Sequence, residues 1–375
     1  MRILWNELKK ILTWKILLLL VLVNSVLYFF LIQFHIEYFP NGRPALDSYN
    51  IGIEMIEKYG TQMDEEEFLD FKIVYDAQVR EADQYLQSRQ EFVLAEFDTY
   101  EKFINYDRDN KELSALHSKL MFEEKEVNTF WELQERGRII EFYEWKEDLP
   151  YANAKQKQRV EELIAAKKYG VYPEVVMMNF KDFIGNVAIT VLFSVVIVIS
   201  PMILRDRSRQ VLALQYTAKI GRSLYKTKIL ASLISAFIVM TALLTIYFGI
   251  YSSNKTSMYF GVSINTFIAN ESWYDPTFFQ YILFCVAMIY VIGFVFSLLA
   301  MSFSSIVPNS MALIGIQIPF IVGMILLMAG PLMRYIIAIG YPQWLAPTGY
   351  GVMAAGSFLF IIVLWAREKK RDILL

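Results

Sequence analysis

The stretch RDRSRQVLALQYTAKIGRSLYKTK, residues 205–228, carries seven basic residues and one acid and lies directly between two long apolar segments. Lys and Arg near the ends of spans resist translocation, so a short basic loop of this kind is typical of the cytoplasmic side of a membrane. The stretch therefore fixes the sidedness of the whole chain. Its apolar residues also predict a short amphipathic helix over 206–216, lying along the inner membrane surface and ended by Gly221.

Charge and hydropathy are separated along the chain. Apolar residues make up 55% of the 375 residues and 20% are charged, while the mean hydropathy is positive. Residues 35–182 hold 32 acids and 19 bases, whereas the rest of the chain holds 6 acids and 17 bases. This partition predicts an acidic soluble domain on one side of a membrane and argues against nucleic-acid binding by that domain.

The apolar segments predict an all-α membrane protein with six transmembrane helices, because about 20 apolar residues cross the hydrocarbon as a helix. Residues 1–34 are interpreted as an amphipathic N-terminus and an uncleaved first span, in which Asn24 is a hydrogen bonder between helices. Basic residues in the loop 205–228 and in the tail 367–375 place both termini in the cytoplasm. The remaining spans are expected at 183–204, 229–251, 278–303, 311–333 and 347–366.

Three segments are expected outside. Residues 35–182 form an extracellular α-helical domain, with helices at 64–105, 111–136 and 154–169, the first two as an antiparallel hairpin. Its acidic run 64–67 is interpreted as a helix start favoured by the helix dipole, with a cation site as the alternative. Residues 252–277 form an extracellular loop, and 334–346 a re-entrant or interfacial helix pair.

The sequence carries no enzymatic signature, so we expect a chain that is not an enzyme. It contains neither His-Glu-x-x-His nor Gly-x-Ser-x-Gly, and no Gly-Lys dipeptide that a phosphate-binding loop requires. The single cysteine, Cys285, excludes an intrachain disulfide, which is compatible with a bacterial plasma membrane. We expect no catalytic residue, cofactor or metal in this chain. Active transport would then need energy from a partner.

The order of residues in the basic loop resembles that in the permease subunits of ABC-2-type (type V) ABC exporters. That family's loop has an acid, an apolar run, Thr-Pro, Arg and finally Lys at the third span. Here Ala218 stands for the proline, and Gln210-Val211 replaces a Gly-Thr step after the acid. Leu345-Ala346-Pro347 before the last span is also similar to the family. The matching positions are Asp206, 212–214, Thr217-Ala218, Arg222 and Lys228.

The resemblance implies a permease that exports an amphipathic or hydrophobic substrate, such as a peptide, antibiotic or lipid. Its partners would be a second permease, identical or a sister subunit, the lipid membrane, and a cytosolic ATPase that holds ATP and Mg. Residues 205–228 would couple to that ATPase. The residues expected to carry the coupling are Asp206, Gln210, Leu212, Leu214, Thr217, Arg222 and Lys228.

Three alternatives stay open at this point. The basic loop would also be explained if it only set the topology, with Arg222 and Lys228 lying along lipid and reaching the headgroups. A membrane sensor or scaffold would bind a ligand or a surface protein with its outer domain and dock a cytoplasmic partner on the loop. A sodium-extruding permease would need carboxylates inside the spans, and the apolar segments contain none.

Overall fold

The structure of the chain is a computed structural model that describes residues 2–124, 128–146, 152–211, 214–215, 221–328 and 330–370, without the side chains of Arg222 and Lys370. These residues are helical or irregular, and their β pairing is limited to isolated bridges, such as that between Tyr172 and Phe267. The chain divides into two compact units. The bundle unit comprises Met1–Phe39, Asn179–Lys255 and Phe279–Leu375, and the polar unit comprises Pro40–Met178 and Thr256–Phe278.

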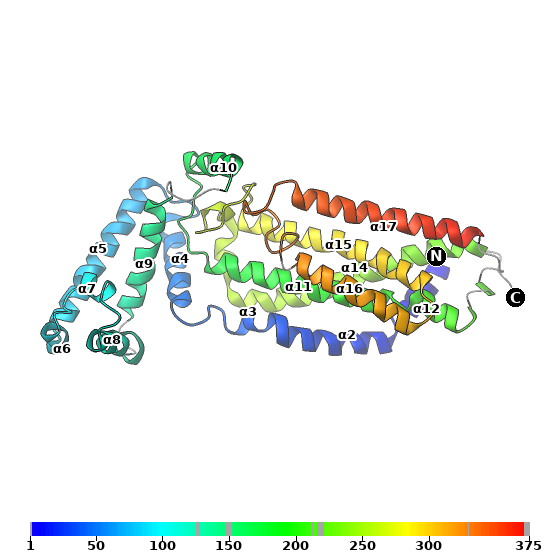
Figure 1. Cartoon of the computed structure of the whole chain (residues 1–375), viewed down its shortest axis with the longest axis horizontal. Coiled ribbons are helices and arrows are strands. Elements are labelled where there is room, and N and C mark those ends of the chain that lie inside the picture. Colours follow the sequence, from blue (N-terminus) through cyan, green and yellow to red (C-terminus); the bar gives the residue numbers. More distant parts are fainter. Residues whose placement is uncertain are drawn as a thin grey trace. The chain divides into compact units, whose positions relative to one another are not determined.

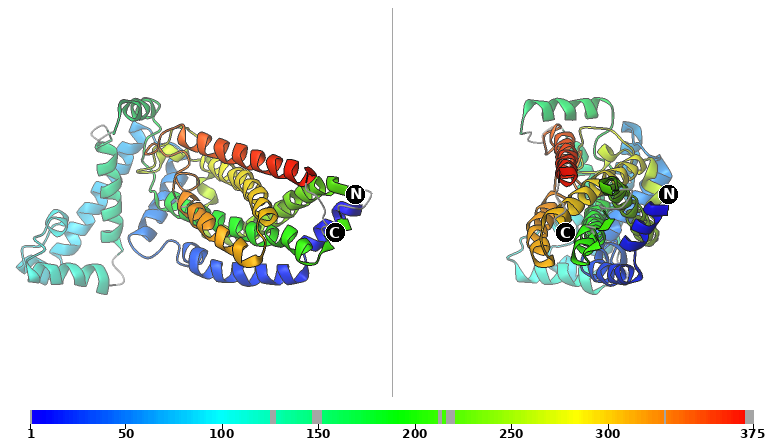
Figure 2. Two further views of the ribbon diagram at one scale, coloured as in Figure 1. Left: turned by 45° about the vertical axis from the view of Figure 1, so that its right-hand side comes forward. Right: turned by 90° about the vertical axis from the view of Figure 1, so that its right-hand side faces the viewer.

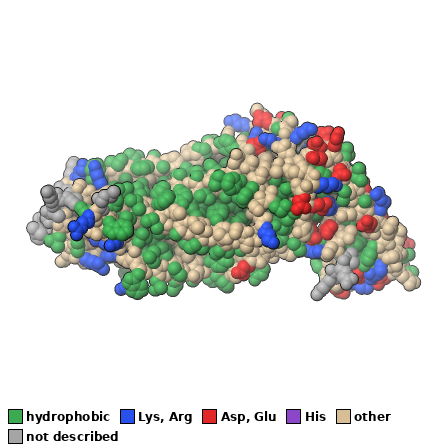
Figure 3. All heavy atoms as spheres, turned by 180° about the vertical axis from the view of Figure 1, so that it is seen from behind, with side chains coloured by type: hydrophobic (Ala, Val, Ile, Leu, Met, Phe, Trp, Pro, Cys, Tyr) green, Lys and Arg blue, Asp and Glu red, His purple; other side chains and the backbone are tan. Residues whose placement is uncertain are grey.

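In the described part of the chain, six helices are long and apolar enough to cross a membrane, so the predicted all-helical fold is confirmed with six candidate spans. They run side by side in the bundle (Figures 1 and 2), and hydrophobic side chains cover the face of the bundle shown in Figure 3. In the most apolar stretch of each helix, 83% of the residues of α11 are buried but only 17% of those of α2. Helix α11 is therefore central and α2 peripheral. The six are α2 (Trp14–Leu27, extended by a π-helical turn Tyr28–Ile32), α11 (Val175–Ile199), α14 (Leu224–Tyr251), α15 (Phe278–Ile306), α16 (Ser310–Met328) and α17 (Leu345–Lys370).

Shorter helices in the described part of the bundle unit include α1 (Arg2–Ile11), α3 (Phe34–Glu37) and α12 (Pro201–Ser208). The helix pair predicted for 334–346 is wrong, because the described residues from 330 to 344 form turns. Pro331 and Pro342 lack the N–H that a helix interior requires. A side chain of α17 stabilises these turns instead, since the hydroxyl of Tyr350 donates to the carbonyl of Leu332 at 2.6 Å.

Asn24 joins three spans, as predicted for a residue that hydrogen-bonds between helices. Its side-chain amide donates to Ser194 Oγ on α11 at 2.9 Å, and its Oδ1 accepts from the hydroxyl of Tyr247 on α14 at 2.8 Å. In hydrocarbon, polar side chains of this kind hold helices together because no water competes for them. Asn24 therefore attaches the peripheral α2 to the centre of the bundle.

The described part of the polar unit contains the helices α4 (Ala45–Tyr59), α5 (Glu65–Gln87), α6 (Gln90–Leu94), α7 (Tyr100–Ile104), α8 (Lys111–Ser118), α9 (Thr129–Glu144) and α10 (Ala154–Ala165). Helices α5 and α9 pack antiparallel, since Phe68 stacks on Tyr143 near one end and Tyr85 meets Phe130 near the other. The acidic run starts α5, as predicted, because Asp64 and Glu67 form a reciprocal capping box.

The single helix predicted over 64–105 is wrong, because the chain turns after Gln87 and again after Leu94. These turns bring Phe92, Phe97 and Phe103 into one core, which a straight helix would hold apart. Positive φ at Glu96 makes the second turn. The second predicted helix is also interrupted, by a π-helical turn at Lys119–Glu123 before α9 starts at Thr129, and α10 ends four residues earlier than predicted.

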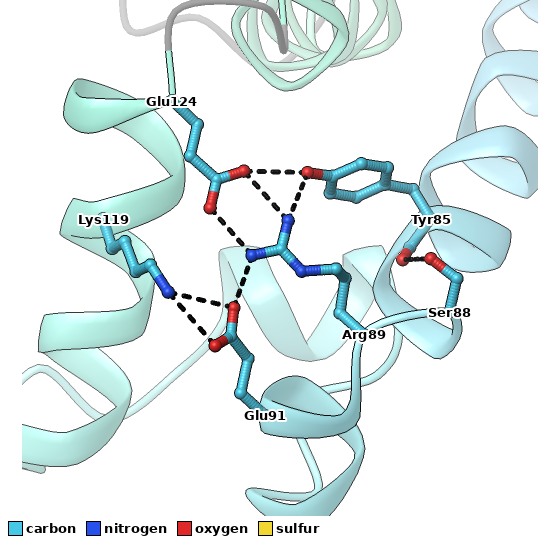
Figure 4. A network of polar contacts seen from close by, with 6 residues as sticks. All are labelled: Tyr85, Ser88, Arg89, Glu91, Lys119 and Glu124. Atoms are coloured by element: carbon cyan, nitrogen blue, oxygen red, sulfur yellow. Dashed lines mark hydrogen bonds and ion pairs between the residues drawn. The ribbon is translucent and has the colours of Figure 1, made fainter.

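Arg89 fixes the first of these turns (Figure 4). Its guanidinium bonds Glu124 at 3.0 Å, Glu91 at 2.5 Å and the hydroxyl of Tyr85 at 2.8 Å, and Lys119 bonds Glu91 at 3.1 Å. The hydrogen bonds from Arg89 hold the pKa of Glu124 below its usual range. The end of α5, the start of α6 and the segment after α8 are thereby tied to one cation.

The segment predicted as a separate extracellular loop, 252–277, contributes most of its length to the polar unit. The backbone N–H groups of Val171 and Tyr172 both donate to the carbonyl of Thr266 at 2.8 Å, and Ile268 N–H donates back to Tyr172 at 2.9 Å. The polar unit is therefore assembled from two stretches of chain that are distant in sequence. The sequence predicted the second stretch as a separate loop because hydropathy alone does not reveal such backbone pairing.

We predict that Asn24→Leu lowers the free energy of unfolding by about 1–2 kcal/mol, because α2 loses its hydrogen bonds to α11 and α14. Unfolding of the purified chain by SDS in mixed micelles measures this. Ser25→Ala is the matched control, since the Ser25 hydroxyl donates only within α2, to the carbonyl of Val21. Equal losses for the two variants would contradict the role of Asn24.

His117 predicts an acid sensitivity of the polar unit. Its ring lies between Phe103 and Tyr106, with centroids 4.7 and 4.9 Å away, and burial lowers its pKa, with Arg108 adding to the effect. The stabilisation by neutral His117 is full above the ordinary pKa of 6.5 and is lost as pH falls through the lowered folded value. Hydrogen exchange in α8 should therefore speed up between pH 7.5 and 5.5 beyond its intrinsic change. His117→Phe keeps the ring stack and should remove most of this acceleration; an unchanged acceleration would refute the assignment.

Candidate functional site

A buried ion cluster lies beside the basic loop in the bundle unit. The ammonium of Lys228 on α14 is 2.8 Å from Glu7 Oε2 on α1 and also bonds Asp206 Oδ2 on α12. Lys228 is fully buried, and Glu7 and Asp206 are 4% and 6% exposed. Two of the predicted coupling residues, Asp206 and Lys228, are thus brought together, and a third residue that sequence reasoning missed joins them.

Glu7 reaches the cluster because of the way α1 folds onto α14. In α1 the residues Leu4, Glu7 and Ile11 share one helical face, and the last two are buried. The outward face carries Trp5, with Lys9 lying over its ring. One sequence feature could have identified Glu7 as a member of the cluster. Glu7 is the single acid of residues 1–34 and lies on the apolar face of an otherwise basic segment.

Further polar groups close the cluster. Lys10 lies 2.6 Å from Glu7 and 3.8 Å from Asp206, so two ammonium groups balance two carboxylates. Gln215 donates to Asp206 at 3.3 Å, and Arg205 donates to the carbonyl of Lys10 at 2.8 Å. Helix α1 is therefore bound to the basic loop by side chains and by its own backbone.

Helix α12 is also anchored to the end of α15. Arg207 donates to the carbonyls of Ser305 and Val307, the latter at 2.6 Å, and the N–H of Leu204 donates to Ser304 Oγ at 3.1 Å. The last carbonyls of a helix lack partners within the helix and carry partial negative charge, which suits a guanidinium. The basic loop is thus attached to α1, α14 and α15 within its first three residues.

Burial makes this cluster energetically sensitive. Taking ions out of water costs several kcal/mol for each ion, and only close opposite charges with further hydrogen bonds repay that cost. A buried pair therefore adds little stability over well-packed apolar residues, but removing one partner leaves an uncompensated charge. The arrangement consequently specifies one position of α1 and α12 against α14.

The other predicted residues divide into two groups. Gln210 and Leu214 face outward, and Leu214 is 69% exposed. Leu212, Thr217 and the side chain of Arg222 lie outside the described residues, as do parts of the amphipathic helix predicted at 206–216. Within the described part, Asp206 belongs to α12 at the end of the second span, and Gln210, with φ +56°, ends that helix in a turn.

The expectation that Lys228 lies along lipid is wrong. Helix α14 begins at Leu224, five residues before the predicted third span, so Lys228 lies inside the helix and its side chain is buried. The pairing with Glu7 and Asp206 overrides the tendency of a lysine near a helix end to reach the headgroups. Helix α14 therefore extends beyond the apolar segment that predicted it, and this extension contains the ionisable Lys228.

A second feature of the bundle unit is a cleft of about 590 Å³ between α2 and α14. Its walls are mainly aliphatic, with Leu20 and Val21 on one side and Ile246 on the other. Asn24 and Tyr247, which bond each other, supply polar groups within it. A cleft of this composition suits an apolar chain with few polar groups.

Fold and site together define a helical membrane protein with six candidate spans and a buried ion cluster at one end of them. Comparisons with models of protein families, with curated proteins and with solved structures found no significant match to this chain. The family suggested by the loop residues is therefore a proposal, argued below from the geometry of the site.

We predict that Lys228→Met lowers the free energy of unfolding by about 3–5 kcal/mol, because it leaves Glu7 and Asp206 buried with a single ammonium nearby. The matched control is Lys226→Met on the same helix, since the exposed Lys226 lies over the ring of Trp365 and should cost less than about 1 kcal/mol. Unfolding in mixed micelles measures both variants. Losses of similar size would show that the cluster does not constrain the fold.

Proposed function

We propose that this chain is the permease subunit of an ABC-2-type exporter, driven by a separate cytosolic ATPase that docks on the loop 205–228. The observation that carries the proposal is the buried ion cluster. It joins the loop to the middle of α1 and to the first turns of α14 through side chains that are shielded from water, as a loop that transmits force requires. A loop that only set the topology would need basic charge alone.

The cluster supports a lever mechanism. A partner that moves the exposed residues of the loop, such as Leu214, displaces α12. The bond from Asp206 to Lys228 then carries that displacement to α14, and Arg207 carries it to the end of α15. Packed interfaces respond by switching between discrete arrangements rather than by deforming continuously. In this proposal, Asp206 and Lys228 act inside the lever, while Gln210 and Leu214 meet the partner.

The proposed function also implies an orientation of the chain in the membrane, its partners and a class of cargo. In this proposal both termini lie in the cytoplasm of a bacterial cell and the polar unit lies outside the plasma membrane, and the basic residues of the loop and tail support this orientation. A second permease, identical or related, completes the path. The chain itself performs no hydrolysis, and ATP and Mg belong to the ATPase. The aliphatic cleft between α2 and α14 favours an amphipathic or hydrophobic cargo.

Co-purification tests the proposal. We predict that the tagged chain, extracted from its native membrane in mild detergent, carries a stoichiometric ATPase and hydrolyses ATP. Leu214→Glu should release that ATPase without changing the free energy of unfolding, because the side chain is exposed. The matched control is Leu94→Glu on α6, where a leucine of the polar unit that is also strongly exposed carries the same change; this variant should keep the ATPase.

Two results would contradict the proposal. One is a chain that purifies alone or with a kinase or another regulator and shows no ATPase activity, which would favour a sensor or scaffold. The other is an ATPase that stays bound after Leu214→Glu and leaves after Leu94→Glu, which would move docking to the polar unit.

A further inference from the structure

At the other end of the first span, a polar node gathers around His35 in α3, entirely within the bundle unit. The backbone carbonyl of His35 accepts a hydrogen bond from Asn179 on α11 and another from Asn254 after α14, both at 2.9 Å. The amide of Asn254 also donates to Asn179 Oδ1 at 3.2 Å. The end of the first span is thereby attached to the second and third spans.

The imidazole ring completes this node through Asn186 on α11. The side-chain NH₂ of Asn186 donates to the carbonyl of Leu31 at 2.7 Å and lies 3.1 Å from His35 Nε2. A carbonyl oxygen can only accept, so the Leu31 contact fixes which end of the amide faces the ring. Nε2 therefore has to accept, and the ring is neutral with its proton on Nδ1.

The charges around the ring oppose its protonation. Burial lowers the pKa of His35, and Arg334 from the segment after α16 lowers it further. Asp182 on α11 is paired with Arg334, and Glu37 on α3 accepts from Gln33 at 2.6 Å, so both nearby carboxylates already have partners.

We propose that His35 is a protonation-controlled latch: its neutral ring keeps the Asn186 side chain in place, and with it the bond from the second span to the end of the first span. A proton on Nε2 would face the N–H of Asn186, and neither group could accept. The Asn186 amide would then have to turn, which would leave the carbonyl of Leu31 without this donor in an apolar setting. The latch does not depend on the transport proposal.

Hydrogen exchange of the full-length chain in detergent tests the latch. Protection of residues 28–39, corrected for the intrinsic rate, should fall roughly tenfold between pH 7.5 and 5.5, as loss of a buried hydrogen bond implies. His35→Gln keeps an acceptor near the Nε2 position but does not titrate, so its protection should be the same at both pH values. The chain has two histidines, so His117→Phe is the control and should respond as the unmodified chain does.

A second variant tests the direction of the effect. Asn186→Asp replaces the donor by a carboxylate that accepts from protonated His35, so lowering the pH should increase the protection of residues 28–39 in this variant. The latch is overturned if the unmodified chain is equally protected at both pH values. It is also overturned if His35→Gln keeps the pH response, or if Asn186→Asp responds in the same direction as the unmodified chain.

Discussion

The contact on which the bundle depends is that of a buried lysine with two carboxylates from other helices. Lys228 would be costly to bury alone, and Glu7 and Asp206 would be equally costly without it. Each charge therefore requires the other two, and α1 and α12 are fixed against α14 by that requirement. The described part of the loop is then anchored to three helices, which is what the proposed coupling to a partner requires.

The apolar parts of the fold could be predicted from the sequence because a span is a local property of about 20 consecutive residues. Residue type and position alone predicted that a helix begins at the acidic run and that Asn24 bonds between helices. The ion cluster could be predicted only in part. Asp206 and Lys228 stand out in the basic loop, but Glu7 lies 221 residues before Lys228, and no local pattern brings these two together.

The polar unit shows a second limit of sequence patterns. Apolar residues at helical spacing continue from Phe68 to Ile104, yet the chain turns twice in that range. Tertiary contacts determine these turns: Arg89 forms an ion pair with Glu124, and aromatic rings from the separate helices pack in one core. Pairing of Tyr172 with the segment around Thr266 is also a long-range contact that hydropathy does not reveal.

Glu7 and Lys228 act on one another rather than stabilising their own helices separately. A double-mutant cycle with Glu7→Gln, Lys228→Met and the combined variant, followed by unfolding in mixed micelles, measures that directly. We predict a coupling free energy of about 1–3 kcal/mol, with the combined variant more stable than the sum of the single losses implies. Additive losses, with coupling close to zero, would contradict it and would leave α1 and the basic loop without the link on which the lever depends.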